Sequence, residues 1–124
     1  MKFYNYPKKS LGQNFLIDKN IVLEIGAGTG NLTKEILLAN PKRIILIEKD
    51  EKLAAELKKK FENYKNLSVI KDDVLNYINN KISYKNMVVF GNLPYNLSTK
   101  ILAKLISLDK WPPWYSKLIL MFQR

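Results

Sequence analysis

The tetrapeptide 92–95, Asn-Leu-Pro-Tyr, has groups suited to chemistry on an amine attached to an aromatic ring. Such an amine is a poor nucleophile because its lone pair is delocalised into the ring. Hydrogen bonds accepted from its protons, by the Asn92 side-chain oxygen and the Leu93 carbonyl, favour the pyramidal, nucleophilic form. Pro94 stiffens the turn, and the Tyr95 ring offers a surface for an unstacked base. The pattern predicts methyl transfer to a base amine; an ordinary Asn/Pro turn is the alternative.

A glycine-rich segment at 26–30, Gly-Ala-Gly-Thr-Gly, follows an apolar run that contains Glu24. Glycines permit a tight turn and let the backbone approach a ligand closely. The dinucleotide fingerprint G-x-G-x-x-G would need a glycine at position 31, where this chain has Asn31. A plain strand-to-helix turn is the alternative. We interpret the segment as a nucleotide-type loop in which Gly26 and Gly28 lie against a cofactor.

Two acidic residues follow later apolar runs. Glu48 stands eighteen residues after the last glycine of that loop, close to the roughly 20-residue offset of a ribose-binding carboxylate. Asp73 is placed to accept from an adenine amine, with the Val74 N–H serving a ring nitrogen. The alternatives are a solvated Glu48 beside Lys49, and Asp72 in place of Asp73. The two positions together predict recognition of an adenosine group.

Five short apolar runs must position these residues, at 21–25, 44–48, 67–70, 87–90 and 117–122. Runs of this kind suit strands buried on both faces. Apolar residues at helical spacing lie between most of these runs. Pro41 disfavours helix at the residue that precedes it, and Ser98 is predicted to cap the helix that carries Ile101. The alternation predicts an α/β fold with a doubly wound, mainly parallel sheet whose ligands bind at the carboxyl ends of the strands.

Composition narrows the function classes. The chain has 124 residues, enough for one domain, and 21 Lys+Arg against 11 Asp+Glu give a net charge of +10. Such a charge favours a nucleic-acid partner, although biased codon usage is an alternative source of the lysines. The absence of Cys and His excludes disulfides, thiolate metal sites and His-based catalysis, and predicts no metal. No run approaches the roughly 20 apolar residues of a membrane span, so a cytoplasmic location is expected.

Residues 9–18, Lys-Ser-Leu-Gly-Gln-Asn-Phe-Leu-Ile-Asp, complete a set of three motifs with the glycine loop and the tetrapeptide 92–95. The set resembles the ribosomal RNA adenine N6-dimethyltransferases of the KsgA and Erm type, over nearly the whole chain. The resemblance implies a Rossmann-like, S-adenosylmethionine-dependent methyltransferase domain, with residues 92–95 as its catalytic loop. It also implies cofactor contacts from Asn14, Leu16, Gly26, Gly28, Glu48, Asp73, Val74 and Asn92.

The motif variants look more like those of the small-subunit enzymes than those of the resistance enzymes. That resemblance implies N6-dimethylation of two adjacent adenosines near the 3′ end of small-subunit rRNA, with a pre-ribosomal 30S-type particle as partner and a monomeric enzyme. Two alternatives are a catalytically impaired RNA- or ribosome-binding module and a DNA adenine N6-methyltransferase. Leu93 in place of a first proline, together with the N-terminal motif, argues against the DNA enzyme.

The sequence departs from the family pattern at both ends. Only residues 18–20 separate the N-terminal motif from the first predicted strand, where the family has a helical segment of roughly one or two dozen residues. After Arg124 the family continues with a helix, two strands and a small helical domain. We therefore expect a partial methyltransferase domain over 1–124 with an N-terminal arm at 1–20, an exposed sheet edge and weak or absent turnover on RNA.

Overall fold

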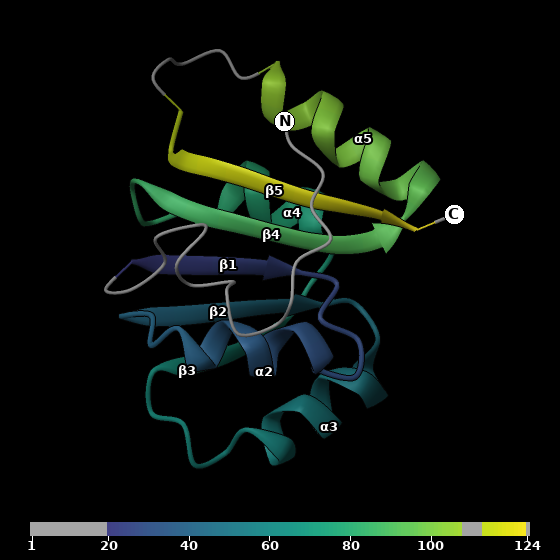
Figure 1. Cartoon of the computed structure of the whole chain (residues 1–124). Helices are drawn as coiled ribbons and strands as arrows, with labels where there is room; N and C mark the ends of the chain where they lie inside the picture. The colour runs from purple at the N-terminus through teal and green to yellow at the C-terminus, as the bar shows by residue number, and fades with distance from the viewer. Residues whose placement is uncertain (1–19, 108–112, 124) are drawn as a thin grey trace.

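The structure is a computed structural model that describes residues 20–107 and 113–123. The predicted cofactor contacts of Asn14 and Leu16, and most of the N-terminal arm at 1–20, lie outside the described residues. Along the described chain, strands and helices alternate (Figure 1). The elements are β1 (Ile21–Ile25), α2 (Asn31–Leu38), β2 (Arg43–Glu48), α3 (Glu51–Lys60), β3 (Leu67–Lys71), α4 (Val74–Asn80), β4 (Met87–Pro94), α5 (Tyr95–Ile106) and β5 (Tyr115–Gln123). The five predicted strands are confirmed.

The strands form one sheet in the order β3-β2-β1-β4-β5, and every neighbouring pair is parallel. At the end of β1, Ile25 pairs with Ile47 on one side and with Gly91 on the other. The strand order reverses at β1, because β2 lies on one side of it and β4 on the other. Because every pair is parallel, the carboxyl ends of the strands meet at one edge of the sheet, the edge to which the arrowheads of β4 and β5 point in Figure 1.

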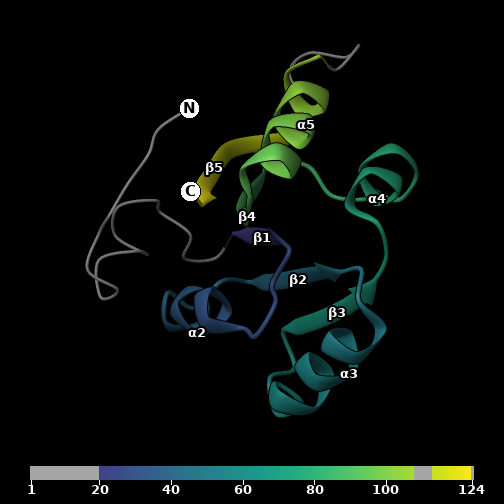
Figure 2. The same cartoon turned by 90° about the vertical axis from the view of Figure 1, so that its right-hand side faces the viewer.

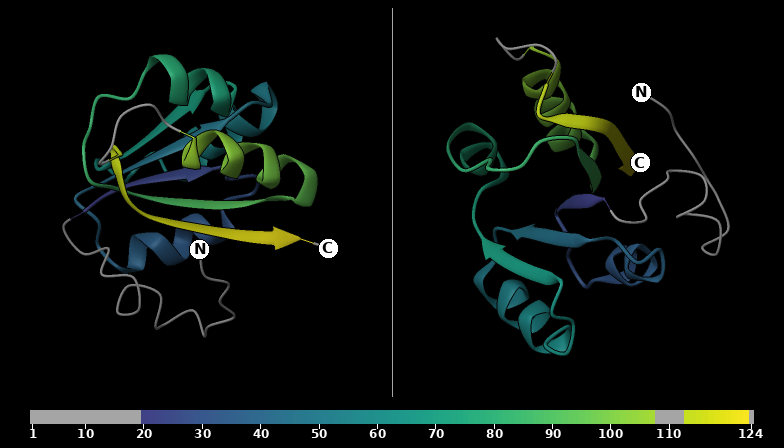
Figure 3. Two further views of the ribbon diagram at one scale, coloured as in Figure 1. Left: turned by 90° about the horizontal axis from the view of Figure 1, so that it is seen from above. Right: turned by 90° about the vertical axis from the view of Figure 1, so that its left-hand side faces the viewer.

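Helices cover both faces of this sheet, which explains the unbroken apolar runs. Val22 and Leu46 pack on one face with Ile36 of α2 and Leu57 of α3. On the other face, residues such as Ile25 and Ile47 pack with α4 and α5. Figures 2 and 3 show α2 on the opposite side of the sheet from α4 and α5. Each fully buried Leu or Ile side chain contributes about 1.5–3 kcal/mol to the stability of the fold. Because helices lie on both faces of a parallel sheet, the predicted doubly wound fold is confirmed.

Helix α4 was not predicted from the sequence. Its buried residues Val74, Tyr77 and Ile78 do follow helical spacing. The helix is only seven residues long and ends in two asparagines, which weakens the periodic signal. Asp73 begins it, because its side chain accepts hydrogen bonds from the N–H groups of Leu75 and Asn76.

The predicted cap at Ser98 is wrong. Strand β4 continues beyond Gly91 because Asn92 and Leu93 pair with Met121 and Phe122 of β5. Helix α5 then starts at once, with Pro94 at its N-cap position and no side-chain cap. Ser98 therefore lies inside the helix, where its hydroxyl donates to the Leu93 carbonyl at 3.3 Å. The tetrapeptide 92–95 is a strand end joined directly to a helix.

Gly30 is required by packing as well as by backbone conformation. Its φ is +87°, and a Cβ there would lie 2.7 Å from a Phe61 ring carbon and 3.2 Å from Leu57. Gly28 also has positive φ, +57°, but a Cβ at that position would meet nothing closer than 4.0 Å. Leu57 of α3 and the adjacent Phe61 therefore pack closely against the loop at Gly30 and not at Gly28.

We expect Gly30→Ala to destabilise the fold more than Gly28→Ala. Both variants suffer backbone strain of about 1–3 kcal/mol, and only Gly30→Ala adds overpacking of about 1–3 kcal/mol against Phe61. Urea unfolding of the two variants measures the difference. Equal losses would show that the Phe61 contact does not constrain this loop.

Candidate active site

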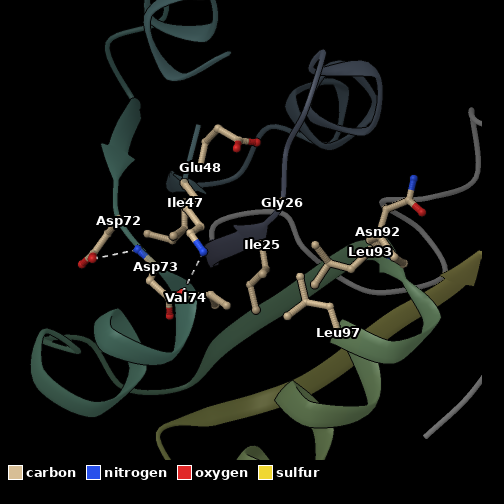
Figure 4. Close-up of a pocket in the computed structure, with 12 residues that line it drawn as sticks. Ile25, Gly26, Ile47, Glu48, Asp72, Asp73, Val74, Asn92, Leu93 and Leu97 are labelled. Atoms are coloured by element: carbon tan, nitrogen blue, oxygen red, sulfur yellow. Dashed lines mark hydrogen bonds and ion pairs between the residues drawn. The ribbon is translucent and has the colours of Figure 1, made fainter. Parts of the chain in front are cut away.

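A cavity of about 260 Å³ lies at the carboxyl edge of the sheet, beside the point where the strand order reverses. Ligands bind at this place in open parallel sheets. In Figure 4, Glu48 and Asp73 lie on one side of Gly26, and Asn92, Leu93 and Leu97 lie on the other. The lining residues are Ile25, Gly26, Ile47, Glu48, Lys49, Asp72, Asp73, Val74, Asn92, Leu93, Pro94 and Leu97.

Glu48 is held in a fixed orientation by backbone donors. Its Oε1 accepts from the Gly28 N–H at 3.1 Å, and its Oε2 accepts from the Asp50 N–H at 3.0 Å. The side chain is only 8% exposed, so the alternative of a solvated carboxylate is wrong. Each carboxylate oxygen has more than one acceptor site, so both can still bind a ligand hydroxyl.

Asp72 and Asp73 differ in how much of each carboxylate is engaged. Asp72 accepts from the Asp73 N–H and the Asn76 amide, and its Oδ2 lies 3.0 Å from the Lys81 ammonium. These bonds to Asn76 and Lys81 lower the pKa of Asp72. Asp73 uses Oδ1 to cap α4, while its Oδ2 is 3.9 Å from Lys49. Both carboxylates line the cavity, and Asp73 has more acceptor capacity left unused, at its Oδ2.

The glycine loop and the end of β4 are in direct contact. Gly26 has φ +68°, and a Cβ there would overlap the Leu93 side chain. The Gly26 N–H donates to the Ile47 carbonyl at 3.1 Å. Any larger residue at position 26 would displace Leu93, so the spacing between the loop and Asn92 depends on this glycine.

The end of β4 presents the other predicted residues. Asn92 is partly buried, Pro94 is exposed, and both line the cavity. The fully buried Ser98 hydroxyl donates to the Leu93 carbonyl, whose oxygen has a second lone pair. The backbone of Tyr95 begins α5, but its side chain lies outside what the structure describes.

Leu97 was missed by the sequence analysis. It is 37% exposed and lines the cavity from the first turn of α5. Its exposure follows from the early start of α5, which the sequence did not signal. Within the described residues, no group of three or more acidic, His or Cys side chains could hold a metal ion, and no helix is long and apolar enough to cross a membrane.

Glu24 is a buried carboxyl group under the glycine loop. It is 1% exposed, and the Thr33 hydroxyl of α2 donates to it at 2.5 Å. Burial raises its pKa from 4.5 to about 7, and the Thr33 bond offsets part of that effect. The pair joins β1 to α2 directly beside the loop.

An open parallel sheet with a glycine loop after β1 and an acidic residue at the end of β2 defines a Rossmann-like domain of the methyltransferase type. The chain belongs to the ribosomal RNA adenine dimethylase family, because the family model of that description matches residues 5–124.

Curated relatives agree with this assignment. The chain is 46% identical to ribosomal RNA small subunit methyltransferase A of Pelagibacter ubique, over 94% of this chain and 49% of the relative. It is 36% identical to the protein of the same name from Nitrobacter winogradskyi, over 94% of this chain and 47% of that protein. The chain thus spans about half the length of the curated relatives it matches.

Solved structures show the same fold. A dimethyladenosine transferase from Plasmodium falciparum superimposes with a TM-score of 0.72 at 34% identity, over 99% of this chain and 44% of that one. The 23S rRNA methyltransferase ErmE gives a TM-score of 0.76 at 20% identity, over 98% of this chain and 48% of ErmE. The second comparison shows the fold alone.

We expect the stability of the fold to fall as pH rises from about 4.5 to 7, through Glu24. In this window the unfolded chain has lost the Glu24 proton and the folded chain retains it, which costs up to about 3 kcal/mol above pH 7. Denaturant unfolding of Glu24→Gln should lack this component. The exposed Glu56→Gln is the control, and a wild-type-like pH dependence in Glu24→Gln would contradict the assignment.

Proposed function

We propose that this chain binds S-adenosylmethionine in the cavity at the carboxyl edge and takes part in N6-methylation of adenosine in RNA. One observation carries the proposal. Residues from four strand ends line a single cavity, with an oriented carboxylate on one side of Gly26 and Asn92 with the end of β4 on the other. A methyl donor and an acceptor amine need this arrangement, because the reacting atoms must be held about 3–3.5 Å apart.

The side of the cavity formed by β2 and β3 suits an adenosine group. Glu48 would accept from the ribose hydroxyls, and Asp73 would accept from the adenine amine. The Val74 N–H, at the start of α4, has no acceptor among the described residues and would serve a ring nitrogen. Gly26 and Gly28 let the loop backbone lie close to the ligand. Asn14 and Leu16 are proposed as further contacts on the family resemblance.

The side formed by β4 suits the acceptor base. S-adenosylmethionine, when bound, supplies an electrophilic methyl group. The Asn92 amide oxygen and the Leu93 carbonyl would accept hydrogen bonds from the two N–H groups of the target adenine amine and so raise its nucleophilicity. Ser98 holds the Leu93 carbonyl in place, Pro94 fixes the bend into α5, and the Tyr95 ring would stack on the base. Positioning of this kind supplies much of the rate.

The substrate proposal depends on the relatives. The two curated relatives described above are named for the ribosomal small subunit, and the net charge of +10 favours a polyanionic partner. We therefore propose two adjacent adenosines near the 3′ end of small-subunit rRNA, within a pre-ribosomal 30S-type particle. The protein would act as a monomer in the cytoplasm.

Calorimetric titration with S-adenosylmethionine tests the cofactor proposal, with NAD as the negative control. We expect saturable binding that Glu48→Gln weakens about tenfold or more, because hydrogen bonds to a charged group contribute about 1.5–3 kcal/mol. The exposed Glu56→Gln should bind like the wild type. No binding by a folded chain would refute the proposal, and RNA binding without methyl incorporation would indicate a non-catalytic RNA-binding module.

Ser98→Ala tests the positioning of the Leu93 carbonyl. We expect the rate of methyl incorporation into unmodified small-subunit particles to fall about tenfold, the order of one hydrogen bond of roughly 1.4 kcal/mol. The affinity for S-adenosylmethionine and the KM for the particles should stay unchanged. Ser83→Ala makes the same chemical change at an exposed loop position and should be silent. A loss confined to thermal stability would assign Ser98 to the core instead.

A further inference from the structure

A second hollow lies at the opposite edge of the sheet. It is formed by the turn between α2 and β2 and the turn between α3 and β3, at the ends of the strands away from the arrowheads (Figure 1). Its volume is about 750 Å³. The polar and aromatic residues that line it are Asn40, Lys42, Asn63, Tyr64, Lys65 and Asn66. None of them was assigned a role above, and we call this hollow the amino-edge groove.

The walls of the amino-edge groove are tied together by hydrogen bonds. The Asn66 side-chain amide donates to the Pro41 carbonyl at 3.0 Å, and the Ile44 N–H donates to the Asn66 carbonyl at 2.8 Å. Asn40 adopts a left-handed φ of 54°, and its N–H donates to the Leu37 carbonyl. The groove is therefore a preformed feature of two joined turns.

Tyr64 presents an aromatic ring to this groove. The ring packs edge-on against the buried Phe61, with centroids 6.0 Å apart, yet Tyr64 stays 48% exposed. Its backbone is fixed by bonds from its N–H to Phe61 and from the Leu67 N–H to its carbonyl. An exposed and oriented ring is a stacking platform for any base, since every base has a π-face.

Two lysines line the same groove as this ring. Lys42 and Lys65 are exposed, and neither forms an ion pair with a carboxylate of the described residues. Lys58, Lys59 and Lys60 occupy the last turn of α3 but do not line the groove, and the Lys60 ammonium donates to the Thr29 carbonyl of the glycine loop at 2.7 Å. By contrast, Lys49, Lys71 and Lys81 each form an ion pair with a carboxylate of the described chain. The amino-edge groove thus combines an aromatic platform with two lysines that have no carboxylate partner in the described part of the chain.

We propose that the amino-edge groove binds single-stranded RNA, with one base stacked on Tyr64 and the flanking phosphates against Lys42 and Lys65. The amides of Asn40 and Asn63 line the groove and can donate to or accept from base edges. A duplex does not fit this mode, because its bases are already stacked. The ligand is an unpaired RNA segment rather than a helix.

This site is separate from the proposed methylation site. The six residues of β2 lie between the two edges, a distance of about 20 Å at roughly 3.3 Å per residue. An RNA that reaches both sites therefore has to be folded or held in a particle. The inference rests on the proposed function only in naming RNA as the ligand, and it needs no methyl donor.

Fluorescence anisotropy with a labelled single-stranded RNA of mixed sequence tests the site on the full chain. We expect Lys42→Gln/Lys65→Gln to weaken binding about tenfold and to reduce the salt slope by about 1.4, since each phosphate contact on a single strand contributes about 0.7. The control Lys100→Gln/Lys104→Gln removes the same charge from exposed positions of α5, away from the groove, and should have a smaller effect.

Tyr64 variants test the stacking platform. Tyr64→Ala should weaken binding about tenfold, and Tyr64→Phe should restore it, while an RNA duplex of the same length should compete poorly. The proposal would be overturned by an equal loss of RNA affinity in the two double lysine variants, or by no loss of RNA affinity in Tyr64→Ala. It would also be overturned if the folded wild-type chain did not bind RNA. Calorimetry with S-adenosylmethionine on the same variants should give wild-type values. Failure of the wild type to bind the methyl donor would sink the proposed function and leave the RNA result standing.

Discussion

The close approach of β4 to the glycine loop is the contact on which the rest of the site depends. The Leu93 side chain fills the space that a Cβ at Gly26 would need, and the Gly26 N–H donates to the Ile47 carbonyl at the end of β2. Three strand ends are thereby fixed relative to one another at the point where the strand order reverses. The oriented Glu48 and the end of β4 at Asn92 face one cavity because this contact holds them there.

The glycine loop is supported from beneath as well. Glu48 binds the Gly28 N–H, Thr33 binds Glu24, and Phe61 packs against the space left by Gly30. A loop with this many fixed contacts is preorganised, so a ligand does not have to order it on binding. The same contacts join the loop to the core, so substitutions of its glycines are expected to affect stability.

Charge is distributed unevenly between the two edges of the sheet. The carboxyl edge carries Glu48, Asp72 and Asp73, each engaged with backbone or side-chain donors. The amino edge carries exposed lysines without ion-pair partners among the described residues. One small domain therefore offers chemically different surfaces at its two ends.

The sequence by itself determined the five strands, the strand-end positions of Gly26, Glu48, Asp73 and Asn92, and the family. Unbroken apolar runs identify strands buried on both faces, and parallel strands bring their carboxyl ends to one edge, so strand-end residues are predictable without coordinates. Tertiary structure alone decided the burial of Glu48, the extension of β4, the bond from Ser98 to Leu93 and the amino-edge groove. The burial of Glu48, the extension of β4 and the groove depend on groups far apart in the chain, as when pairing with β5 keeps Asn92 and Leu93 extended. The bond from Ser98 to Leu93 spans only five residues, but it forms because that pairing carries β4 on to the start of α5, and local sequence patterns carry no record of such pairings.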